Sequence, residues 1–190
     1  STTTENTNIG IFKLSDDYTK VVSHKCVMKD LRREAPVIVN KDGLYYMLSS
    51  ACTGWAPNQC KLSTSKKLDK GWSQLENIGD DNAFRTQAAA VLEIKGTKQT
   101  TYLYVGDRWL ERELPASRII IFPISFKDGK VEKFNAKTGN DTLKEMINIC
   151  KNSDMLGEVA LVPYDSPISN SNIVFLETLY DENAACHIAL

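Results

Sequence analysis

Glu34 is a candidate general acid, because its carboxyl group can donate a proton to a leaving group. It lies in the sequence Arg33-Glu34-Ala35-Pro36, and proline disfavours helix at the preceding residue, so this segment is expected to be extended and to lead into a strand. An acid at the mouth of a strand, with aromatic residues downstream, is one way to build a sugar-binding site. The alternative is an ordinary surface glutamate.

The sequence Thr53–Asn58 contains the residue types that bind a sugar. The indole of Trp55 can stack on the apolar face of a pyranose ring, and Thr53 and Asn58 can form hydrogen bonds with sugar hydroxyls. The simpler alternative for Trp55 is a tryptophan that only packs its own loop.

The elements that would position these residues are predicted to be strands. Residues 9–125 contain short apolar runs separated by turn signals, and no window has a sustained 3.6-residue stripe. Val39 to Tyr45 is predicted to be a hairpin with Asp42 and Gly43 in its tight turn. This pattern is typical of a sandwich, a barrel or a propeller. The runs are 9–14, 36–39, 44–48, 88–92, 101–105 and 118–122.

The chain changes character near residue 126. Residues 140–150 place four apolar side chains at helical spacing, which predicts a helix with one apolar face. Residues 157–163 and 171–176 are predicted to be short strands. The second part of the chain is therefore expected to be mixed α/β.

Composition excludes several classes of protein. The 190 residues carry 23 Lys+Arg against 24 Asp+Glu, a balance that disfavours a nucleic-acid partner. No apolar run is long enough for a membrane helix, and residues 1–8 do not resemble a signal peptide. The five cysteines are expected to be mostly free thiols, with a Cys52–Cys60 bridge as the alternative in an oxidising compartment.

Several motifs of the first part occur in the order found in one carbohydrate-active family. They resemble the later blades of glycoside hydrolase family 43, a five-bladed β-propeller, and most closely its exo-β-1,3-galactanase branch. The resemblance covers about residues 9–125. The motifs are Glu34-Ala-Pro, 42–49, 52–58, Gly71-Trp72, Thr86-Gln87, 104–109 and 117–123.

This resemblance implies an inverting glycosidase that acts on a galactan-like oligosaccharide or polysaccharide and needs no cofactor. Glu34 would be the general acid, and Gln87 would position water or a sugar hydroxyl across the site. Thr53 and Trp55 match sugar contacts.

The motif Asp107-Arg108-Trp109 also occurs in this series and is a further candidate for substrate binding, or else a buried ion pair that braces a blade. Family members use further acidic residues from their first blades. This chain starts at what resembles the end of the second blade, so an incomplete site around Glu34 is expected.

The second part resembles another family. Gly157–Pro163, which contains Glu158, is followed by Thr178–Leu190, which contains His187. Taken alone, these two residues are compatible with an edge charge and a core histidine. The whole string resembles the metal-binding region of metallopeptidases of the aminopeptidase T type, also called thermophilic metalloproteases, over about residues 126–190.

This second resemblance implies two divalent metals that activate water for attack at peptide N-termini. Glu158 and His187 match two of the ligands, and a carboxylate with an imidazole suits a zinc-like ion. The other ligands of the family have no counterpart in the chain, so metal binding is expected to be weak.

The sequence is therefore interpreted as a composite. A mainly β part at 1–125, a partial propeller of later blades, is followed by a small mixed α/β fragment at 126–190, with the junction near residues 125–131. Three functions remain open: a glycosidase, a metallo-aminopeptidase, and a non-catalytic fragment or weak sugar-binding module. The first parent is expected to be extracellular or periplasmic and the second cytoplasmic.

Overall fold

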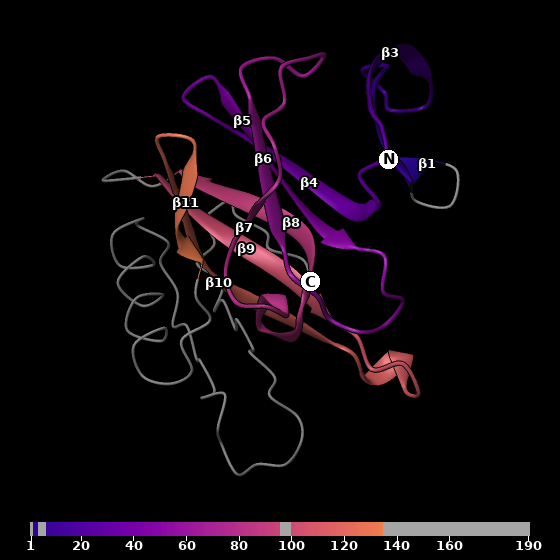
Figure 1. The fold of residues 1–190 in the computed structure, drawn as a ribbon, viewed down its shortest axis with the longest axis vertical. Helices are drawn as coiled ribbons and strands as arrows, with labels where there is room; N and C mark the ends of the chain where they lie inside the picture. The colour runs from indigo at the N-terminus through magenta and orange to yellow at the C-terminus, as the bar shows by residue number, and fades with distance from the viewer. Residues whose placement is uncertain (1, 4–6, 96–99, 135–190) are drawn as a thin grey trace, which may run out of the picture.

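The computed structural model of the protein describes residues 2–3, 7–95 and 100–134 (Figure 1). Within these ranges the chain is mainly β, and every strand pairs with its neighbours in antiparallel fashion. No helix in the described part is long and apolar enough to cross a membrane.

The described strands form three sheets. The first contains β1 (Thr2–Thr3), β2 (Asn8–Leu14) and β3 (Val21–Met28). The second contains β4 (Arg33–Lys41), β5 (Leu44–Ala51), β6 (Lys61–Ser65) and β7 (Glu76–Asn77). The third contains β8 (Gln87–Lys95), β9 (Thr100–Arg108), β10 (Arg118–Lys127) and β11 (Lys130–Phe134). Two short 3₁₀ turns, η1 (Ala83–Arg85) and η2 (Leu114–Ala116), precede β8 and β10.

The second and third sheets are meanders, in which each strand pairs with the next one along the chain. The predicted hairpin between β4 and β5 is present. Its turn residues Asp42 and Gly43 have φ angles of 53° and 79°, which a two-residue turn between twisted strands requires.

The main core lies between the second and third sheets, and it follows from alternation along the strands. Tyr46 and Leu48 on β5 are buried, as are Tyr102 and Tyr104 on β9, because every second side chain of a strand points to the same face. The other buried members of this core are Val39, Cys60, Leu62, Ile78, Ala83, Ala88, Phe122, Ile124, Phe126 and Phe134.

The third sheet continues past residue 125. β10 pairs with β9 and also with β11, so antiparallel structure extends to Phe134. The predicted helix at 140–150 and the predicted strands at 157–163 and 171–176 lie outside the described residues, and so do Glu158 and His187.

Cys26 and Cys60 are free thiols, in agreement with the main expectation from the sequence. The Cys52–Cys60 bridge, which was the alternative, is not formed. Burial raises the pKa of the Cys60 thiol to about 11, so this side chain is uncharged at neutral pH and packs as a small apolar group.

Candidate active site

Glu34 lies within β4, at an irregularity of the strand. It pairs with Ser50 of β5, and the register then shifts between Glu34 and Val37. Ala35, inside this bulge, has a φ of 47°, in the left-handed region that costs a non-glycine residue energy. A bulge bends a strand and changes the direction of its side chains, so it determines where the Glu34 carboxylate points.

A buried arginine precedes the bulge. Arg33 is only 4 % exposed, and its Nη2 donates to the carbonyl oxygens of Ser49 and, at 2.9 Å, Gln59. Its Nε donates to the Ser49 hydroxyl at 3.2 Å. A buried guanidinium is costly unless its hydrogen bonds are made, so this network fixes the strand immediately before Glu34. Sequence analysis did not identify Arg33, because its partners are backbone groups that no motif displays.

Gln87 is the first residue of β8 and reaches across to β4. Its Nε2 donates to Glu34 Oε1 at 3.1 Å and to the Ser50 hydroxyl at 2.9 Å. The two predicted catalytic residues are thus in direct contact, although they are far apart in the sequence. Because Oε1 accepts the amide N–H, a proton on the Glu34 carboxyl group would be carried by Oε2.

Two tryptophans continue this network. The indole Nε1 of Trp109 donates to Gln87 Oε1 at 3.1 Å, which fixes which way the amide is turned. The rings of Trp109 and Trp55 meet edge to face, with centroids 5.5 Å apart and an interplanar angle of 65°. Trp55 is 45 % exposed and Trp109 37 %, so both retain apolar surface that a ligand could cover.

The loop that carries Trp55 is held by its own polar side chains. Asn58 accepts from the Ala51 N–H at 2.7 Å and donates to the Ala51 carbonyl at 3.0 Å and the Thr53 hydroxyl at 2.7 Å. Thr53 in turn donates to the Ala56 carbonyl at 2.6 Å. Both predicted sugar-binding residues therefore also act as supports that hold Trp55 in place.

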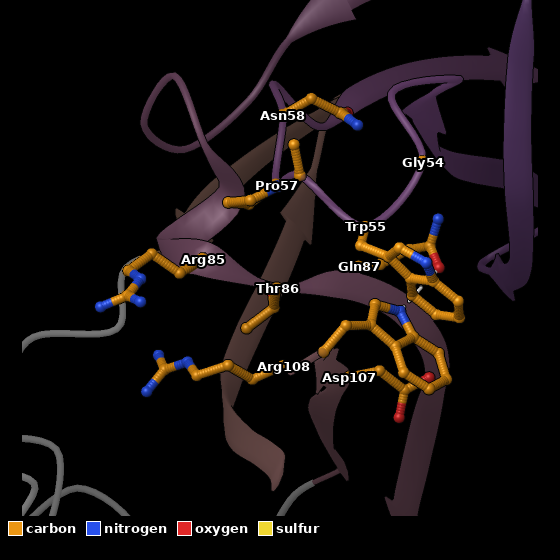
Figure 2. A pocket seen from close by; sticks show the side chains of 11 residues that line it. Gly54, Trp55, Pro57, Asn58, Arg85, Thr86, Gln87, Asp107 and Arg108 are labelled. Atoms are coloured by element: carbon orange, nitrogen blue, oxygen red, sulfur yellow. Dashed lines mark hydrogen bonds between the residues drawn. The ribbon is translucent and has the colours of Figure 1, made fainter. Parts of the chain in front are cut away.

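Four of the residues described above line a pocket between the Trp55 loop, the beginning of β8 and the end of β9: Trp55, Asn58, Gln87 and Trp109 (Figure 2). Asp107 and Gln87 are cross-strand partners, and burial raises the pKa of the Asp107 carboxyl group. Arg108 Nη2 donates to the Phe84 carbonyl at 2.9 Å. The lining residues are Gly54, Trp55, Ala56, Pro57, Asn58, Arg85, Thr86, Gln87, Asp107, Arg108 and Trp109.

The structure thus brings together all the predicted glycosidase residues that it describes. Glu34 is not itself a lining residue of the pocket, but it contacts Gln87, which is. Arg85 and the backbone turn that carries it were not predicted. No group of three or more His, Cys, Asp or Glu side chains that could hold a metal occurs within residues 2–3, 7–95 and 100–134.

The fold is similar to that of exo-β-1,3-galactanases. The enzyme from Clostridium thermocellum superimposes with a TM-score of 0.65 and 36 % identity, over 67 % of this chain and 29 % of that one. The enzyme from Phanerochaete chrysosporium, solved with galactose, gives a TM-score of 0.60 and 33 % identity, over 66 % of this chain and 29 % of that one. The chain spans less than a third of the length of either galactanase.

The C-terminal part is similar to a different class of enzymes. Residues 117–190 match the family model of thermophilic metalloproteases (M29). Aminopeptidase 2 of Geobacillus stearothermophilus is 54 % identical over 69 residues, which are 36 % of this chain and 17 % of that protein. Aminopeptidase T of Thermus aquaticus is 45 % identical over 64 residues, which are 34 % of this chain and 16 % of that protein.

These similarities confirm the composite interpretation. A region similar to family 43 galactanases is joined to a region similar to M29 aminopeptidases. The M29 match begins at residue 117 and includes β10 and β11, which belong to the third sheet. The M29 match therefore reaches into the sheet that also contains β8 and β9.

The contact between Gln87 and Glu34 can be tested by placing a second carboxylate there. Gln87→Glu is nearly isosteric, and two carboxylates this close cannot both ionise readily, so we expect one pKa of the pair to rise well above about 4.3, the ordinary value for Glu. Carbon NMR titration of the carboxyl groups would measure it. Gln74→Glu, at an exposed position, is the matched control and should titrate normally. Ordinary titration of both carboxyls at the Gln87→Glu site would contradict the contact.

Proposed function

We propose that the galactanase-like region carries a glycoside hydrolase site for β-1,3-linked galactan, with Glu34 as the general acid. The observation that carries this proposal is the hydrogen bond between Gln87 Nε2 and Glu34 Oε1, made beside two partly exposed tryptophans. Hydrolysis of a β-1,3-linked galacto-oligosaccharide by the chain, with the α-anomer as the first product seen by proton NMR, tests it.

The proposed reaction is hydrolysis of the glycosidic bond with inversion. An inverting glycosidase needs an acid on one side of the bond and a water-activating group on the other, roughly 6.5–9.5 Å away. Glu34 would protonate the leaving oxygen from Oε2. The Gln87 amide is held by Trp109 and lies 3.1 Å from Glu34 Oε1, which is too close for the group on the opposite side of the bond. It would therefore position a sugar hydroxyl beside the acid, and the water-activating group would be another residue.

The sugar itself would bind against the tryptophans. A pyranose ring stacked on Trp55 would place its hydroxyls near Thr53 and Asn58. The Thr53 hydroxyl already donates one hydrogen bond and accepts another, and its oxygen has a second lone pair that can accept from a sugar hydroxyl. Asp107 and Arg108 are further candidate contacts, because both line the pocket.

A metallo-aminopeptidase is the second candidate function, and the M29 match over residues 117–190 favours it. Glu158 and His187 would be two ligands of a zinc-like metal pair, and peptide N-termini would be the substrate. A cytoplasmic location would accompany this function, whereas an extracellular or periplasmic one would accompany the glycosidase.

Zinc titration distinguishes a complete metal site from one that lacks part of its ligands. A catalytic zinc usually has three protein ligands and a water, and the resemblance supplies two. We therefore expect weak zinc binding in calorimetry, with little difference between the unmodified chain and His187→Ala. Tight binding that disappears in His187→Ala would contradict this expectation and favour the peptidase.

A non-catalytic sugar-binding module is the third candidate. It is supported by the tryptophan-lined pocket, because partly exposed indoles can hold a sugar ring. Such a module would bind galactan oligosaccharides without releasing galactose.

A further inference from the structure

The pocket carries two arginines at one end. Arg85 and Arg108 both line it, and Figure 2 shows their guanidinium groups on the side away from Trp55 and Gln87. Asp107 is the only acidic residue that lines this pocket, among the parts of the chain that are described, and burial raises the pKa of its carboxyl group, which disfavours the charged form. The lining residues therefore have an excess of positive charge.

The backbone that presents Arg85 is strained. Ala83, Phe84 and Arg85 have φ angles of 49°, 56° and 60°, so three consecutive non-glycine residues adopt the left-handed conformation. Each such residue costs on the order of 1–3 kcal/mol and persists only where its surroundings enforce it. Here Asn82 Oδ1 accepts from the Arg85 N–H at 3.0 Å, and the Thr86 hydroxyl donates to the Ala83 carbonyl at 2.6 Å.

Arg108 is linked to the turn that carries Arg85. Its hydrogen bond to the Phe84 carbonyl connects the end of β9 to the middle of the strained turn. The Arg108 guanidinium is thereby held at the end of the sheet and supports the turn. The exposed side chain of Arg85 extends from this turn. The position of this pair of cations is defined by the fold and does not depend on a flexible tail.

We propose that this end of the pocket binds the carboxylate of an acidic sugar, such as a uronate attached to the galactan chain. The proposal rests on the glycosidase function above, because the tryptophans would hold the neutral galactose while the arginines hold the acidic branch. A guanidinium is planar and pairs with a carboxylate through two parallel hydrogen bonds, whereas neutral sugar hydroxyls give it no charge to neutralise.

Calorimetric titration of the full chain with matched sugars tests the proposal. The probes are β-1,3-galactobiose, the same disaccharide with a 6-linked glucuronate, and the same disaccharide with a 6-sulfate. We expect the glucuronate form to bind most tightly, with an advantage over the neutral sugar that shrinks at high salt. Equal affinity for the neutral and glucuronate forms would overturn the proposal, and sulfate binding as tight as glucuronate would overturn the assignment to a carboxylate.

Arg85→Gln should weaken glucuronate binding by about threefold to tenfold, the range between exposed and partly buried charge pairs, and leave the neutral sugar unchanged. Arg112→Gln removes the same charge from an exposed position outside the pocket and should change neither affinity. An equal effect of both substitutions would overturn the proposal. Failure to bind neutral galactobiose would instead overturn the proposed function, so the two results are distinguishable.

Discussion

Glu34→Gln is expected to reduce the hydrolysis of a β-1,3-linked galacto-oligosaccharide by about 10²-fold to 10⁴-fold, the usual contribution of general acid catalysis. The galactose leaving group is poor and needs a proton as the bond breaks. An aryl galactoside with a good leaving group needs none, so its hydrolysis should fall much less. The ratio of the two losses, measured as kcat/KM, is therefore diagnostic of the acid.

The glutamine side chain nearly preserves the shape of Glu34 and can still meet the Gln87 amide, so the substitution should cost little stability. Glu76→Gln, on the exposed strand β7, removes the same charge away from the pocket and is the control. Equal losses on both substrates would show that Glu34 is not the acid. No hydrolysis by the unmodified chain would favour the sugar-binding module.

Phe122→Ala is expected to destabilise the protein by about 3–5 kcal/mol, as for other large aromatic side chains removed from a core. Phe122 is 1 % exposed and stacks on Tyr104 with ring centroids 4.7 Å apart. Its ring also packs edge to face against Phe84 and tilted against Phe134, with ring centroids 5.7 and 5.3 Å away. Its removal leaves a cavity at the centre of the core between the second and third sheets.

Urea unfolding, followed by tryptophan fluorescence, would measure this loss. Ile119→Ala is the control, because Ile119 lies on the same strand and is 45 % exposed, and it should cost less than about 1 kcal/mol. Similar losses for the two variants would mean that the core does not form as described.

Much of the β structure could be predicted from the sequence because the signals are local. Short apolar runs between turn signals marked β5 and β9, and the Asp42-Gly43 pair marked the hairpin. The strand β6 was not predicted, because Ser63 and Ser65 appear polar in the sequence. In the structure both are buried, with their hydroxyls bonded to the carbonyls of Ser73 and Lys70 at 2.7 and 2.6 Å.

Residue chemistry suggested Glu34 and the Trp55 loop as candidates, but only the family resemblance placed Gln87 in the same site. Glu34 and Gln87 are 53 residues apart, and no local pattern indicates that their side chains touch. The bulge at Ala35 and the left-handed turn ending at Arg85 were also invisible, because neither contains the glycine that usually marks a positive φ. These conformations are imposed by long-range contacts, such as those of Arg33 with Gln59.

The extension of the M29 match into β10 and β11 bears on how the chain can be divided for expression. A gene cut at codon 125 would split β10 and remove Phe126 and Phe134, both of which are buried in the main core. It would also leave β10 with a newly exposed edge, which promotes aggregation. A soluble galactanase-like piece should therefore end no earlier than Phe134, well inside the range that matches the peptidases. Similarity to a family marks ancestry, whereas the smallest stable piece is set by which strands complete the core.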